Sequence, residues 1–214
     1  MTSTTATAEG MAAGSGDYPV QVTFDPNTSI NRLWGIPIVG WIVRGIALIP
    51  HAIVLWAMGI LLGFSILVSW IPVLLMGRQA AMLVWLYSTY IRYTTRVFAW
   101  ALFLSAPYPP IIPNGDNYPV NVSVDGTGSI NRLWGIPFLG IWLRYILVIP
   151  HLLVLFVLYF AVAFFAIFGF VFILIGGRMP TIAYALVGGF LRITARASLY
   201  IFLVPIRYPP ISLT

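Results

Sequence analysis

The nine-residue stretch SINRLWGIP occurs twice in this chain, at 29–37 and at 129–137. It belongs to a longer correspondence that needs no gaps and has a constant spacing of 100 positions. The other shared residues, each with a copy 100 positions later, include Tyr-Pro-Val at 18–20, Ile-Pro-His at 49–51, Gly-Arg at 77–78 and Tyr-Pro-Pro at 108–110. We therefore expect a tandem duplication of one unit of about a hundred residues. Repeat 1 would occupy 17–113 and repeat 2 would occupy 114–214.

The composition places this duplicated unit in a membrane. Hydrophobic residues make up 60% of the chain and charged residues only 7%, far from the usage of soluble domains. Segments 51–76 and 151–177 contain no charged residue, and each exceeds the roughly 20 residues that cross a bilayer. A second apolar segment in each repeat, 80–106 and 181–206, would return the chain to its starting side. The sequence thus predicts an all-α, multi-pass membrane protein with four transmembrane helices, two per repeat.

The segments that precede these helices have a different character. Residues 30–49 and 130–149 are apolar but interrupted by Arg, Pro and Gly, which favours a helix lying in the membrane interface. A fifth and a sixth crossing are the alternative. Residues 18–25 and 118–125 alternate valine with polar residues, as short strands do, and the two strands could pair outside the membrane. The Ser/Thr/Ala/Gly-rich tail at 1–16 is expected to be disordered, because it lacks the basic start and apolar core of a signal peptide.

The distribution of arginine predicts an orientation. In the four-crossing topology, the face that carries the strands would hold Arg32, Arg132 and Arg207, whereas the other face would hold Arg78 and Arg178. Because cytoplasmic loops carry an excess of basic residues, we expect both chain termini to lie in the cytoplasm and the protein to reside in the cell (inner or plasma) membrane.

Arginine also supplies the candidate binding groups. All 11 basic residues are Arg, and no Asp or Glu lies in the membrane segments. Arginine makes planar, two-pronged contacts with phosphate and carboxylate, whereas an uncompensated charge at mid-bilayer costs roughly 3 kcal/mol on insertion scales. We therefore hypothesise that these arginines bind an anion or a lipid headgroup. The alternative is that their side chains only reach the membrane interface and anchor the helices there. The candidates are Arg32, Arg44, Arg92, Arg96, Arg132, Arg144, Arg192 and Arg196.

Other repeated polar and aromatic residues favour structural roles. His51 and His151 each follow a proline at the start of a predicted membrane helix, which indicates a capping or interfacial histidine. Haem ligation and proton relay are alternatives, but no carboxylate stands nearby to support the imidazole. Ser29 is a candidate N-cap. Backbone, headgroup or aromatic-belt contacts are expected of Asn31, Trp34, Asn131 and Trp134, with paired lipid or partner contacts as the functional alternative.

The repeated pattern YPV…D…NRLWG…R…IPH…GR…R…R…YPP covers nearly all of 18–211. It resembles a bacterial family of small integral-membrane proteins known as a domain of unknown function, common in actinobacteria and sometimes present in two copies per chain. The resemblance implies a membrane protein from an actinobacterial source. It brings no established activity and assigns no role to any residue.

The sequence contains no cysteine, no Ser/His/Asp set, no intramembrane acidic pair, no metal-ligand cluster and no phosphate-binding loop pattern. We therefore expect no enzyme activity, no cofactor and no metal. A nucleic-acid partner is disfavoured because the arginines are spread along membrane segments. The predicted function is a non-catalytic accessory, assembly or lipid-organising subunit that binds anionic lipid or an acidic membrane partner. A membrane-protein complex or a homo-oligomer is the expected assembly. The alternative is a small, oligomeric transporter or channel for an anion or another solute.

Overall fold

The computed structural model describes residues 18–25, 29–111, 118–137, 139–204 and 207–213, so the predicted tail at 1–16 lies outside the described residues. The first half of the chain contains β1 (Val20–Phe24), the 3-10 helix η1 (Arg32–Gly35), α2 (Val39–Val68), α3 (Trp70–Met76) and α4 (Ala81–Ala101). The second half contains β2 (Val120–Val124), the 3-10 helix η2 (Arg132–Gly135), α5 (Leu139–Gly176) and α6 (Thr181–Ile201). The single helix α5 thus occupies the place of α2 and α3 together.

The two strands form an antiparallel ribbon in which Val22 lies opposite Val122. This confirms that the alternating segments are strands that pair with each other. The valines on one side of the ribbon are buried, whereas Thr23, Asn121 and Ser123 on the other side are exposed. Because equivalent strands pair about the Val22–Val122 position, an approximate twofold axis passes through the centre of the ribbon.

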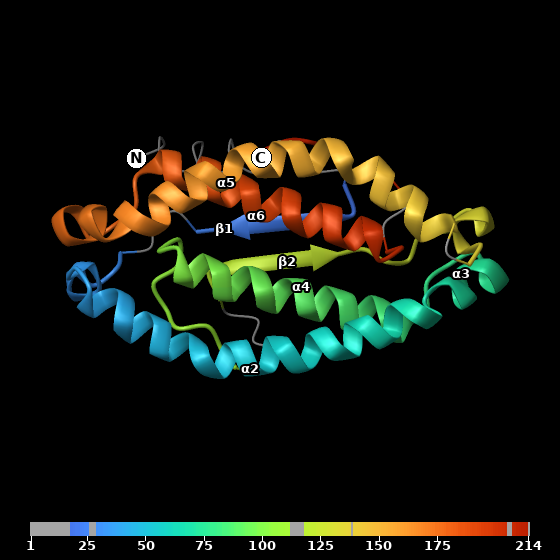
Figure 1. Ribbon diagram of the computed structural model, residues 1–214, viewed down its shortest axis with the longest axis horizontal. Coiled ribbons are helices and arrows are strands. Elements are labelled where there is room, and N and C mark those ends of the chain that lie inside the picture. Colours follow the sequence, from blue (N-terminus) through green and yellow to red (C-terminus); the bar gives the residue numbers. More distant parts are fainter. Residues whose placement is uncertain (1–17, 26–28, 112–117, 138, 205–206, 214) are drawn as a thin grey trace, which may run out of the picture.

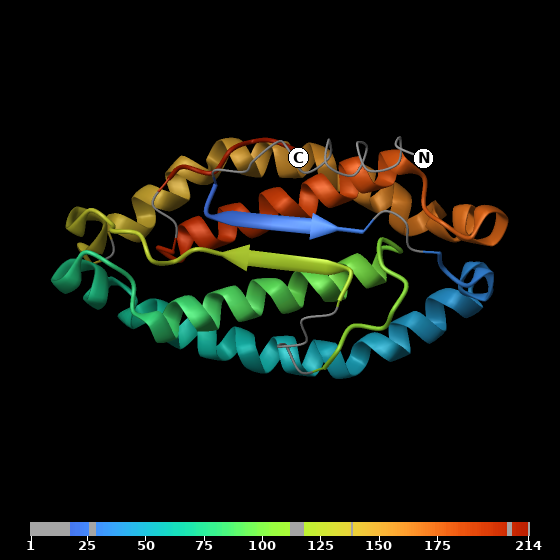
Figure 2. The same ribbon diagram turned by 180° about the vertical axis from the view of Figure 1, so that it is seen from behind.

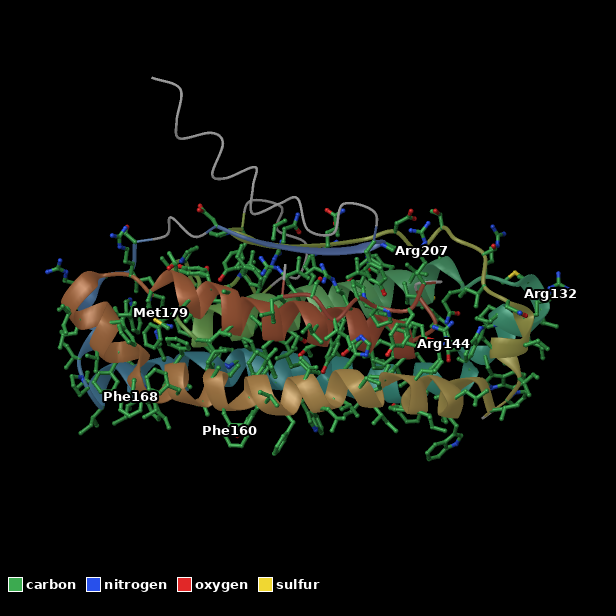
Figure 3. All side chains as sticks on the ribbon, turned by 90° about the horizontal axis from the view of Figure 1, so that it is seen from above. Arg132, Arg144, Phe160, Phe168, Met179 and Arg207 are labelled. Atoms are coloured by element: carbon green, nitrogen blue, oxygen red, sulfur yellow. The ribbon has the colours of Figure 1, made fainter. Side chains whose placement is uncertain are left out.

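The helices lie in two layers under this ribbon, and all of them run along the long axis of the molecule (Figure 1, Figure 2). The inner layer consists of α4 and α6, which contact each other, and they pack on β2 and β1 respectively. The outer layer consists of α2, which packs on α4, and α5, which packs on α6. Figure 3 shows the ribbon on one side of the molecule and α5 on the opposite side. The hydrophobic core between ribbon and inner helices includes Val20, Val22, Val122, Tyr87 and Leu199.

The two halves exchange their repeated SINRLWGIP segments. The N–H of Ile30 donates to the carbonyl of Gly177 at 2.8 Å, and the N–H of Ile130 donates to that of Gly77 at 2.6 Å. Accordingly η1 packs on α5, and η2 packs on α3. Each segment therefore lies beside the Gly-Arg turn of the other half. The expectation that these segments and the Gly-Arg turns occupy opposite faces is wrong, because each turn forms the docking site of the other half's segment.

The predicted interfacial helix at 30–49 is not a separate element. Instead η1 covers Arg32–Gly35, and α2 begins at Val39 and continues through Pro50 and His51. In the second half α5 likewise runs through Pro150. Pro50 has no N–H, so the carbonyl of Ile46, four residues earlier, loses its helical donor. The Tyr108 hydroxyl donates to the carbonyl of Ala47, one turn before Pro50, at 2.8 Å.

Three helical stretches among the described residues are long and apolar enough to cross a membrane: Val39–Met76, Leu139–Gly176 and Thr181–Ile201. The chain therefore has the character of a membrane protein. The fourth predicted span, 80–106, forms the helix α4, which does not belong to this group. Besides two arginines, which α6 has as well, α4 carries three tyrosines, three threonines and one serine, and these make its sequence less apolar.

Candidate functional site

The arginines that were predicted to bind anions fall into three environments. Two of them, Arg92 and Arg96 on α4, reach the edge of strand β2, where their Nε atoms donate to the carbonyls of Val122 (3.1 Å) and Val120 (3.0 Å). The equivalent residues on α6 make the equivalent contacts with β1: Arg192 with Val22 at 3.1 Å and Arg196 with Val20 at 3.5 Å. These four guanidinium groups therefore donate hydrogen bonds to backbone carbonyls of the two strands.

The carbonyls at the outer edges of the ribbon need hydrogen-bond donors because of the way the two strands pair. Asp25 N–H donates to Pro119 and Asp125 N–H donates to Pro19 across the ribbon. In an antiparallel pair the inward-facing backbone groups alternate with outward-facing ones, so the carbonyls of the buried valines face away from the partner strand. An unpaired carbonyl away from water costs about 1–3 kcal/mol. The arginines satisfy these carbonyls, and the carbonyl dipoles in turn compensate cations that have no acidic neighbour in sequence.

The arginines of α6 also hold the C-terminal segment. Arg192 Nη1 donates to the carbonyl of Leu213 at 2.8 Å, and Arg196 Nη1 donates to the Ser212 hydroxyl at 3.1 Å. The segment that follows the second Tyr-Pro-Pro motif is thereby fixed along α6.

Arg44 and Arg144 occupy a second environment, inside the protein. Both are buried, and their Nη1 atoms donate to carbonyls near the ends of α4 and α6, those of Trp100 and Tyr200. The Arg44 guanidinium lies 4.4 Å from the Trp100 ring centre and 3.8 Å from that of Phe103. Such faces attract a cation, most strongly away from water. The same residues also contact the tryptophans of the repeated segment, with Arg44 5.2 Å from Trp34 and Arg144 5.0 Å from Trp134.

Trp34 and Trp134 are each half-buried against an arginine of their own half, and their place in an aromatic belt stays a prediction. The position of the N-cap also differs from expectation. The side chains of Asn31 and Asn131, not Ser29, cap η1 and η2 by accepting from the N–H of the residue two positions later, at 3.0 Å.

The histidines lie within the long helices and not at a helix start. His51 is fully buried, and its Nδ1 lies 2.5 Å from the Tyr93 hydroxyl. His151 is equally buried, but its Nε2 lies 2.9 Å from the carbonyl of Pro209 and its Nδ1 lies 3.3 Å from the Tyr208 hydroxyl. Each histidine also lies beside the Tyr-Pro-Pro motif of its own half, since the His51 and Tyr108 ring centres are 4.8 Å apart and His151 contacts Tyr208 and Pro209.

Arg32 and Arg132 occupy the third environment and are exposed. A Cβ built on Gly177 would lie 3.6 Å from Arg32 Nε, and one built on Gly77 would lie 3.6 Å from Arg132 Nε. Each side chain therefore rests on a Gly-Arg turn of the other half, next to exposed Arg178 or Arg78. Figure 3 shows Arg132 at one extreme end of the molecule. The structure thus places Arg32 and Arg132 against the turns that carry Arg178 and Arg78, which sequence spacing did not predict.

Arg78 and Arg178 were not predicted as site residues. The signal that could have identified them is the repeated Gly-Arg turn, since Gly77 and Gly177 both have φ of 66°. Glycine adopts this left-handed conformation freely and commonly ends helices in this way. The turn therefore stops the long helix and exposes the following arginine.

An open apolar groove of about 370 Å³ lies between α5, α6 and the C-terminal segment, and Leu153 and Val157 in its lining are largely exposed. Its lining is entirely hydrophobic: Leu153, Val154, Val157, Leu158, Ile193, Ile211 and Leu213. A hydrocarbon chain fits the chemistry of this lining, since apolar cavities favour apolar occupants.

Comparison with known proteins adds one similarity. Residues 40–112 match the model of a family described as Domain of unknown function (DUF4389). No curated protein and no solved structure matches the chain. The matched region, which contains α2, α3, α4 and the first Tyr-Pro-Pro motif, is thus similar to a family of unknown function.

Proposed function

We propose that this chain is a non-catalytic protein of the cell membrane that binds and organises anionic lipids, as an accessory or assembly subunit. The headgroup ligands would be two arginine pairs, Arg32 with Arg178 and Arg132 with Arg78. The observation that carries the proposal is that exposed Arg32 and Arg132 each lie against the glycine that directly precedes exposed Arg178 or Arg78 of the other half.

The chemistry of these pairs suits phosphate. A guanidinium group offers a rigid fork of N–H donors that matches phosphate oxygens, and two forks can share one diester headgroup. A basic residue near an anionic membrane surface contributes about 1 kcal/mol. Four such residues would therefore contribute about 4 kcal/mol, roughly a thousandfold preference for anionic over neutral lipid.

The proposal narrows the original set of eight arginines. Six of them donate to backbone carbonyls in the fold, which leaves Arg32 and Arg132 as headgroup ligands. The alternative is an anion or solute pathway lined by the α4 and α6 arginines. It has less support because those guanidinium groups already donate to the carbonyls at the strand edges.

The test is native mass spectrometry of the full chain extracted gently from its membrane. Changing the four end arginines to Gln should abolish retention of anionic lipid, and changing only Arg32 and Arg178 should reduce it by about half. Arg207→Gln is the control, because Arg207 is exposed on the ribbon side, away from the end marked by Arg132 (Figure 3). Unchanged lipid retention in the fourfold variant would refute the proposal, as would an equal loss in the control.

A further inference from the structure

The outer layer of the molecule presents exposed apolar surface on both of its long helices. Large hydrophobic side chains on α2 and α5 are exposed along the whole length of both helices. Figure 3 shows Phe160 and Phe168 of α5 pointing away from the ribbon. Exposed residues of this face include Trp41, Ile46, Ile53, Trp56, Phe64 and Leu75 on α2 and α3, and Trp142, Leu153, Phe156, Phe160, Phe164 and Ile175 on α5.

The length of this face does not match the thickness of a bilayer. Helix α5 has 38 residues, which corresponds to about 57 Å at 1.5 Å per residue. The hydrocarbon core is about 30 Å thick. Fitting the whole apolar length of α5 into that core would require a tilt of about 58°, beyond the range of about 0–40° seen for membrane helices. Upright helices would instead expose apolar ends such as Trp142 and Ile175 to water.

The polar ribbon gives a second, independent argument. It runs parallel to the helices near the middle of the long axis (Figure 2), and Val22–Val122 is its central pair. If the helices stood upright, exposed Thr23, Asn121 and Ser123 would lie at mid-bilayer depth facing lipid. The structures that span the hydrocarbon region are helices and closed barrels, and a two-stranded ribbon is neither. The ribbon side therefore belongs at a water-exposed surface.

The internal symmetry agrees with this placement. If the helices stood upright, the twofold axis through the ribbon would lie in the membrane plane, and the two identical SINRLWGIP segments would face opposite compartments. If the molecule lies flat, the axis is normal to the membrane, and both copies occupy the same environment. Identical sequence at equivalent positions is the expected result of one shared environment.

We infer that the molecule lies flat in a single leaflet, with the α2/α5 face in the hydrocarbon and the ribbon at the surface. Two stacked helix layers, each about 10 Å thick, give about 20 Å. One leaflet offers about 15 Å of hydrocarbon and about 6 Å of headgroup region. The helices are long enough to cross the membrane, but they lie parallel to it. This inference does not depend on the proposed headgroup sites.

The test is the sidedness of single cysteines, which the absence of native cysteine makes direct. Four exposed positions report on the two ends: Ser29 and Arg178 at one end, and Ser129 and Arg78 at the other. Each single variant to Cys is expressed as the full chain and treated with a membrane-impermeant maleimide in intact cells and in inverted membrane vesicles. Labelling after detergent solubilisation gives the full reactivity of each site.

Each arrangement gives its own pattern. Flat insertion predicts that all four cysteines react from the same side. Upright helices in this fold would separate Ser29→Cys and Arg178→Cys from Ser129→Cys and Arg78→Cys. Four crossings with parallel repeats would separate the two serine positions from the two arginine positions. Either of the last two patterns, or labelling of any site from both sides, would overturn the inference.

Discussion

Replacing Gly35 by Ala tests the exchange of the repeated segments between the halves. A Cβ at this position would lie 2.5 Å from the backbone nitrogen of Leu174 and 2.8 Å from the carbonyl oxygen of Phe170, both in α5. Backbone atoms cannot rotate away as a side chain can, so η1 must move off the helix. Overpacking of this kind costs about 1–3 kcal/mol. The Gly35→Ala variant should therefore have a lower free energy of unfolding.

Gly59 provides the matched control, because nothing lies within 4 Å of a Cβ built there. Gly59 is inside α2, where Gly→Ala favours the helix by about 0.5–1 kcal/mol. At about 2–4 °C per kcal/mol for a chain of this size, Gly35→Ala should lower the Tm in detergent by about 2–12 °C. Gly59→Ala should raise it by about 1–4 °C. A Gly35→Ala variant as stable as Gly59→Ala would show that η1 does not dock on α5.

Three further substitutions test the buried contacts by the same thermal unfolding assay. Arg96→Met removes the donor to the Val120 carbonyl and should cost about 1–3 kcal/mol; an unchanged Tm would contradict the strand-edge role. Arg44→Lys keeps the charge but loses the planar face that lies on aromatic rings, and should lower the free energy of unfolding by about 1–2 kcal/mol. A variant as stable as the unchanged protein would show that the aromatic contacts of Arg44 do not stabilise the fold. Tyr93→Phe removes the hydroxyl beside His51 and should cost about 0.5–1.5 kcal/mol, whereas a gain in stability would argue against that hydrogen bond.

Local patterns predicted the elements of this fold well. Alternation of valine with polar residues predicted both strands, and the apolar segments that begin at 80 and 181 correspond to α4 and α6. The start of α2 was misplaced because arginine and proline suggested an interruption. In the structure the Arg44 cation is surrounded by aromatic rings, and the Tyr108 hydroxyl bonds to the helix near Pro50. Neither contact is visible in the neighbouring sequence.

The arrangement between the halves could not be predicted. Because both repeats contain the same SINRLWGIP segment and the same Gly-Arg turn, pairing within a half and pairing between halves look identical in sequence. The partners of Arg92 and Arg192 were equally hidden, since they are backbone carbonyls, and a carbonyl belongs to every residue. For the same reason, spacing along the chain gave no indication that Arg32 and Arg178 would lie together.

The account depends most on a flat molecule with one lipid-facing side, and depth measurements along α2 test this most directly. Ile42, Ile53 and Phe64 are exposed on α2 at intervals of 11 residues, about three helical turns. Spin labels on cysteines at these positions, in a lipid bilayer, report depth through their relative access to oxygen and to a polar nickel complex. Flat insertion predicts similar depths at all three positions. An upright helix would carry the label at 53 near the bilayer centre and those at 42 and 64 about 16 Å away towards opposite surfaces, and that profile would contradict the account.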